Sequence, residues 1–152
     1  MLPASLQVSA SPRVRLARVA LDAALSVPDV LGAEAGSHGV RVTAGPASAL
    51  LRGVSVTAQA DGGYAVDLCL VARMAPLVAL GEEVRRRVQA SARRDGLGDQ
   101  LGTVNVEFAH LLTPEEARRD SEDARDGAAP ATAGATPAVA PPAGPLGRET
   151  GR

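Results

Sequence analysis

The sequence predicts an α+β domain, a two-layer sandwich in which two helices cover one face of a small mixed or antiparallel sheet. Three observations support this prediction: a segment of helical period near each end of the domain, strand-like alternation between them, and alternation again after the second helix. The expected order is therefore helix, four strands, helix and strand. Each layer would bury its apolar face against the other.

The first helix is expected from Arg13 to Val27. Ser11 supplies an N-cap, Pro12 suits the first turn, and Pro28 ends the helix. Its polar residues form one narrow stripe, so the rest of the helix should press a wide face against the sheet. The large apolar residues expected on that face are Val14, Leu16, Val19, Leu21 and Leu25.

Four strands should follow the first helix. Two short ones are expected at Val30–Ala35 and Val40–Ala44, on either side of a turn-rich quartet. A hairpin comes next, because apolar residues alternate with others over Val54–Ala60 and again over Tyr64–Leu70. The Asp-Gly-Gly connection at residues 61–63 supplies the positive φ angles that such a turn requires.

The second helix is the best-marked element. Pro76 suits its first position, and Gly96 provides a left-handed stop. Three- and four-residue spacing defines a core face made of Leu77, Leu80, Val84 and Val88. Acid-before-base spacing of four residues predicts two stabilising ion pairs, Glu82 with Arg86 and Glu83 with Arg87.

The last strand and the domain limits complete the layout. Alternation predicts a strand over Val104–Phe108, which closes a domain of residues 12–112 behind a flexible N-terminus of residues 1–11. Residues 113–126 begin like a helix cap but offer almost nothing to bury, so we expect at best a solvated helix. Residues 127–152 are rich in Ala, Pro and Gly, which predicts a disordered tail.

Composition limits the class of protein. The chain has 152 residues, 45% of them hydrophobic, and a net charge of −1, which argues against a polyanion binder that acts through bulk charge. It has neither an apolar run long enough to cross a bilayer nor a secretory signal pattern, so we expect a cytoplasmic protein. All 16 basic residues are Arg, a bias typical of GC-rich coding that weakens any functional reading of arginine.

The sequence shows no catalytic, cofactor-binding or metal-binding pattern. The single cysteine, Cys69, lies in a strand-like run and is expected to be a buried thiol. His38 and His110 have no second ligand at metal-binding spacing, and neither a nucleophile elbow nor a phosphate-binding loop is present. We therefore expect a protein that is not an enzyme and needs no cofactor or metal.

The second helix offers the one candidate interaction surface. Its basic residues form a strip comprising Arg85, Arg86, Arg87, Arg93 and Arg94. Such a strip could contact phosphates, which makes weak nucleic-acid binding the alternative function. Glu82 and Glu83 offset part of the charge, and the near absence of aromatic residues removes stacking platforms for single strands, so nucleic acid is the less favoured partner.

Three segments together resemble the alkaline shock protein family of envelope stress response proteins. These are RVALDAALSVPDV, GVSVTAQADGGYAVDLCLVAR and GEEVRRRVQASARRDGLGDQLGTVNVEF, and the likeness covers Val14–Leu112 with its best match at Thr103–Glu107. Asp29 stands where the family usually has glycine, and residues 73–76 replace its Tyr-Gly pair, which indicates a divergent member. The resemblance implies a non-enzymatic cytoplasmic protein, peripheral to the inner face of the membrane, that self-associates or binds a membrane-anchored protein partner.

Overall fold

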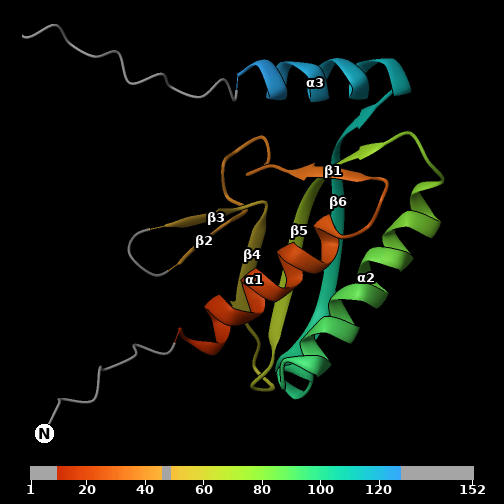
Figure 1. Ribbon diagram of the computed structural model, residues 1–152. Coiled ribbons are helices and arrows are strands. Elements are labelled where there is room, and N and C mark those ends of the chain that lie inside the picture. The colour runs from red at the N-terminus through yellow and green to blue at the C-terminus, as the bar shows by residue number, and fades with distance from the viewer. Residues whose placement is uncertain (1–9, 46–48, 128–152) are drawn as a thin grey trace, which may run out of the picture.

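The computed structural model describes residues 10–45 and 49–127 and confirms the α+β class (Figure 1). Its elements, in chain order, are α1 (Pro12–Leu25), β1 (Val30–Ala33), β2 (Val42–Ala44), β3 (Leu50–Arg52), β4 (Val54–Ala58), β5 (Tyr64–Arg73), α2 (Leu77–Arg94), η2 (Gly98–Gln100), β6 (Leu101–Leu112) and α3 (Pro114–Asp126). The predicted flexibility of residues 1–9 and disorder of residues 128–152 concern segments outside the described residues.

The main sheet is mixed and is built around β5. β4 pairs antiparallel with its first half, with Val56 opposite Val66, and β1 pairs antiparallel with its second half. β6 runs parallel to β5 along its other side. β2 and β3 form a separate two-stranded sheet. The predicted strand order was wrong in omitting β3, because a strand of three residues is too short to show alternation.

Helices α1 and α2 lie over the same face of the main sheet, as the sandwich prediction requires (Figure 1). The helix-facing positions of the strands are fully or almost fully buried beneath them. These positions include Val54, Val56, Val66, Leu68, Leu70 and Val104. This contact between the two layers is the hydrophobic core of the domain.

Helix α1 packs through alanines. Ala17, Ala20 and Ala24 are fully buried, whereas Leu25, predicted to belong to the apolar face, is 42% exposed. Small side chains let a helix approach its neighbours closely, so a narrow stripe is buried and the flanks stay accessible to water. The prediction of a wide buried face was therefore wrong at Leu25.

Helix α2 follows the predicted pattern with two corrections. Leu80, Val84 and Val88 are buried as expected, and Gly96 adopts a φ of +72° just after the helix. Leu77 is 39% exposed instead of belonging to the core, so the core face of α2 begins at Leu80. Pro76 is the N-cap and not the first helical residue, a shift of one position.

The chain after residue 100 is more regular than predicted. β6 extends over 12 residues, and its register with β5 shifts between Phe108 and His110, where one extra residue forms a bulge. α3 confirms the helical expectation for residues 113–126: Thr113 and Glu116 form a reciprocal capping box. Of the α3 side chains only Ala117 is buried, so this helix extends beyond the sandwich (Figure 1).

Candidate interaction surfaces

The arginines of α2 are largely committed to partners within the domain. Arg85 donates from Nε to the carbonyl oxygen of Val104 at 3.1 Å, which ties α2 to β6. Arg87 donates to the carbonyl oxygen of Ser26 at 2.9 Å, which ties α2 to the end of α1. Such bonds hold guanidinium groups against the protein surface and reduce their freedom to meet an external anion.

Two glutamates of α2, Glu82 and Glu83, form ion pairs with its arginines, and one of the two predicted pairs is wrong. Glu83 pairs with Arg87 at 2.8 Å as expected, and it also contacts Arg86. Glu82, however, pairs with Arg85 three residues later and not with Arg86. The hydrogen bond of Arg87 to Glu83 lowers the pKa of that carboxyl, so it stays ionised at a lower pH than a free glutamate does.

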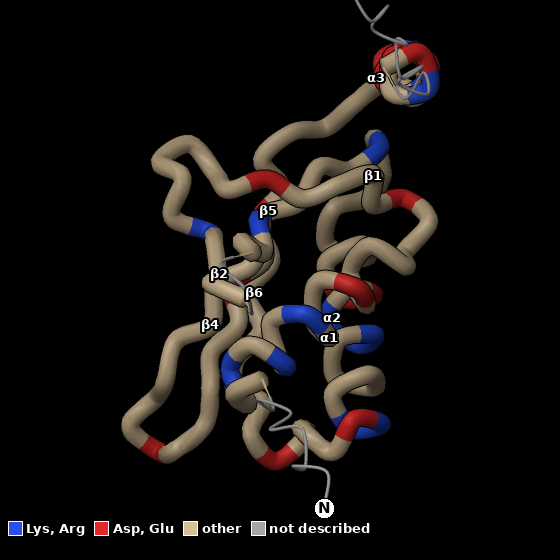
Figure 2. The backbone as a smooth tube through the Cα atoms, turned by 60° about the vertical axis from the view of Figure 1, so that its left-hand side comes forward, with Lys and Arg blue, Asp and Glu red and all other residues tan. Residues whose placement is uncertain are grey.

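Arg93 and Arg94 are exposed at the end of α2. Arg94 donates to the Ser91 hydroxyl at 3.0 Å. Arg15 of α1, which the sequence did not assign to this strip, reaches the carbonyl oxygen of Asp95 at 3.2 Å. Both helices carry acidic as well as basic positions, which Figure 2 shows in red and blue along the backbone.

The outer face of the sheet carries a polar cluster that sequence reasoning missed. Arg41 lies 3.4 Å from Glu107 and 3.9 Å from Asp67. Asn105 donates to Asp67 at 2.9 Å across the β5–β6 pair. Arg41 comes from the loop before β2, far along the chain from both strands, so no local spacing could have revealed this contact.

Cys69 is fully buried beneath this cluster, which confirms the expected buried thiol. Burial raises the pKa of the thiol, and the carboxylate of Glu107 adds to that rise, while Arg41 opposes it. The protonated form is therefore favoured, and a nucleophilic role has no structural support.

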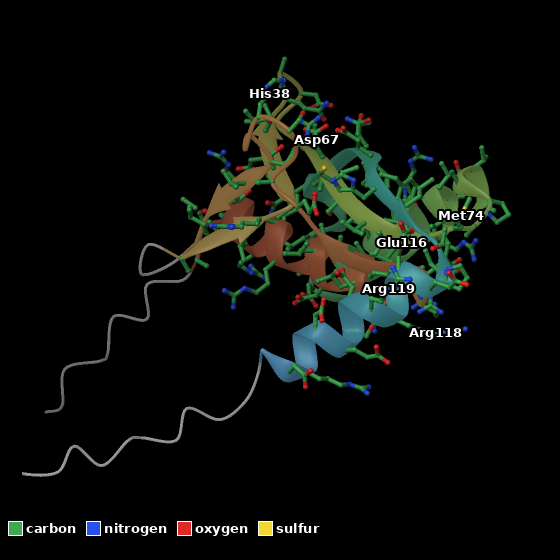
Figure 3. The ribbon with its side chains drawn as sticks, turned by 90° about the horizontal axis from the view of Figure 1, so that it is seen from above. His38, Asp67, Met74, Glu116, Arg118 and Arg119 are labelled. Atoms are coloured by element: carbon green, nitrogen blue, oxygen red, sulfur yellow. The ribbon has the colours of Figure 1, made fainter. Side chains whose placement is uncertain are left out.

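The two histidines have different surroundings. His38 is exposed in the loop after β1, and His110 contacts Glu34 at 3.3 Å (Figure 3 labels His38). Across residues 10–45 and 49–127, no group of three or more His, Cys, Asp and Glu side chains could hold a metal ion.

Exposed apolar side chains gather where β5 and β6 end and α2 begins. Met74 is 62% exposed and Val78 83% exposed, and Leu77 and Leu111 are 39% and 40% exposed. The amide of Met74 donates to the carbonyl oxygen of Leu112 at 3.0 Å, which joins the two chain segments. We call Met74, Leu77, Val78 and Leu111 the apolar patch. Figure 3 shows Met74 well apart from His38.

Comparison with known protein families, with curated proteins and with solved structures finds no match for this chain. In the part of the chain that the structure describes, no helix is both long and apolar enough to cross a membrane.

Proposed function

We propose that this protein is a non-enzymatic structural or interaction module of the cell-envelope stress response. It acts by self-association or by binding a membrane-associated protein partner at the inner face of the cell membrane. The sequence resemblance to the alkaline shock protein family supports a role in the envelope stress response. The exposed apolar side chains of the domain support action through contact with another protein.

The observation that carries the proposal is the apolar patch. Patches of exposed apolar side chains on small domains commonly mark contacts with other proteins. Val78 protrudes almost fully into water from the first turn of α2, with Met74 three residues before that helix begins. The basic strip of α2 is less suited to contact a partner than the apolar patch, because Arg85, Arg86 and Arg87 form ion pairs within the domain.

Fractionation of native cells tests the proposal. The full chain should sediment with membranes after an envelope stress such as alkaline shock, and it should leave them on a carbonate wash, as a peripheral protein does. Replacing Met74 with Glu should shift it to the soluble fraction, because a charge in the patch opposes burial against a partner. Val40→Glu is the matched control, since Val40 is equally exposed but lies outside the patch.

Two results would contradict the proposal. One is equal membrane association of the Met74→Glu protein and the parent. The other is sedimentation that nuclease treatment abolishes, which would favour the nucleic-acid alternative.

A further inference from the structure

Strand β6 forms one edge of the main sheet. It pairs with β5 on one side, and among the described residues no strand pairs with its other side. An edge strand presents a row of backbone N–H and C=O groups that another strand can bind. At 12 residues β6 is the longest strand of the fold, so this edge is unusually extensive for a small domain.

The register identifies which groups face outward. Cys69 donates its N–H to Gly53 on the β4 side, so its neighbours Leu68 and Leu70 direct their backbone groups toward β6. In the parallel register that pairs Leu68 with Val106 and Leu70 with Phe108, the backbone groups of Val106 and Phe108 then point to the outer edge.

The two halves of this edge differ. In the first half the carbonyl of Val104 already accepts the hydrogen bond from Arg85 of α2, which obstructs strand pairing there. In the second half, none of residues 10–45 and 49–127 bonds to the outward groups of Val106 and Phe108. The open half of the edge therefore begins near Val106.

The apolar patch borders this open half. Val78 precedes Arg85 by seven residues, so both lie on one side of α2, the side that faces the β6 edge. Because α2 runs back along the sheet from the end of β5, its first turn, which contains Val78, lies toward the end of β6 (Figure 1). Arg85, two turns later, reaches Val104 near the start of β6. A strand added at Val106–Leu111 would cover Val78 and Leu111.

We propose that the open half of the β6 edge binds the same half of β6 from a second copy, antiparallel and about a two-fold axis near Phe108. The inference rests on the self-association branch of the proposed function. Such a dimer would join two four-stranded sheets into one continuous sheet.

Strand β6 is a suitable partner for itself because its two faces match under this symmetry. Val106, Phe108 and Leu111 lie on the helix side, where two copies would place apolar residues together. On the outer face the bulge keeps Glu107 and His110 on one side, where they contact Arg41 and Glu34. With the bulge in both copies, antiparallel pairing about Phe108 sets Glu107 of one copy beside His110 of the other, where an imidazole N–H can donate to the carboxylate.

Sedimentation of the full chain over a concentration series tests the dimer. We expect reversible doubling of mass, and Val78→Lys should weaken the dimer by at least about tenfold, because it places a charge beside the paired strands. Val40→Lys introduces the same charge at a 62% exposed position away from β6 and should leave the dimer unchanged.

Amide hydrogen exchange on the same samples locates the interface. The amides of Val106 and Phe108 should be protected in concentrated parent protein and exchange rapidly in Val78→Lys, while amides of β5 stay protected in both. A dimer that persists in Val78→Lys, or unprotected Val106 and Phe108 amides in a dimer, overturns the proposal.

Self-pairing of β6 and action at the cell envelope can be tested separately. A chain that is monomeric at all concentrations, yet sediments with membranes through its apolar patch, removes the second copy and leaves the envelope function standing. Protection of the β6 edge that appears only when an extended peptide from another protein is added also overturns self-pairing.

Discussion

At the scale of single residues, Gly53 occupies a backbone position that only glycine fits, and composition does not reveal this. It connects β3 and β4 with a φ of +86°, and its amide donates to the carbonyl oxygen of Arg41 at 2.7 Å. Its own carbonyl accepts from Cys69 of β5 at 2.9 Å. A Cβ atom added at Gly53 would collide with the side chain of Ala33, so three neighbouring segments approach this one backbone position.

Replacing Gly53 with Ala should destabilise the domain by about 2–4 kcal/mol, because backbone strain adds to overpacking. Gly62→Ala is the control: Gly62 also has a positive φ, of +87°, but a Cβ atom there would meet open space. That control should cost only about 1 kcal/mol. Urea unfolding followed by circular dichroism measures both, and equal losses would show that the close approach to Ala33 does not matter.

Cys69 provides a second test at this scale. Its burial and raised pKa predict that a thiol-specific reagent reacts far more slowly with the folded protein than with the urea-unfolded chain. Because the folded-state pKa is above the ordinary thiol value, raising the pH to that ordinary value should not restore full reactivity. Rapid labelling of the native protein would contradict the burial of this side chain.

At the scale of elements, α3 differs from α1 and α2 in what holds it in place. It buries only Ala117, and its first turn depends on the capping box between Thr113 and Glu116. An isolated helix of 13 residues is marginal in water, so the cap decides whether α3 forms. Figure 3 labels Glu116, Arg118 and Arg119 on this helix, which Figure 1 shows beyond the end of the sandwich.

Thr113→Ala should therefore melt α3 without unfolding the domain. The lost cap is worth about 1 kcal/mol, comparable with the stability of such a helix. Carbon chemical shifts of residues 114–126 should move toward random-coil values while β5 amides remain protected from exchange. Ser121→Ala serves as the control, since Ser121 bonds only to a carbonyl of its own helix.

The capping box also gives α3 a pH dependence. Hydrogen bonds from Thr113 lower the pKa of the Glu116 carboxyl. Because the folded-state pKa is below the ordinary value, the cap contributes stability at neutral pH and loses it as pH falls through that lowered pKa. The helical shifts of α3 should thus persist at the ordinary carboxyl pKa and disappear below it, whereas in Glu116→Gln they should not titrate with this group.

At the scale of the whole molecule, the sequence predicted the elements better than their contacts. Hydrophobic period sufficed for α2 and for the β4–β5 hairpin, because Val84, Val88, Val56 and Val66 repeat at regular spacing. It could not predict the parallel pairing of β6 with β5, which joins segments separated by a whole helix. The contact of Arg41 with Glu107 and the unpaired edge of β6 follow from that pairing, so they too escaped prediction.

Nucleic-acid binding, the alternative function, also depends on the whole surface. Affinity for phosphates rises with the number of arginines that are free of internal partners. Arg85 and Arg87 bond to backbone carbonyls, and Arg86 pairs with Glu83, which leaves mainly Arg93 and Arg94 at the end of α2. We therefore expect weak binding to RNA or DNA at about 150 mM salt, with a shallow dependence on salt.

Fluorescence anisotropy with labelled single- and double-stranded oligonucleotides, titrated across a salt series, measures this expectation. Each phosphate contact adds about 0.9 to the slope of log affinity against log salt for duplex DNA. A surface of five free arginines would give a slope of several units, and Arg93→Glu would reduce it by roughly one. Micromolar or tighter binding with that steep slope would make nucleic acid the partner, while a slope unchanged by Arg93→Glu would show that this helix makes no phosphate contact there.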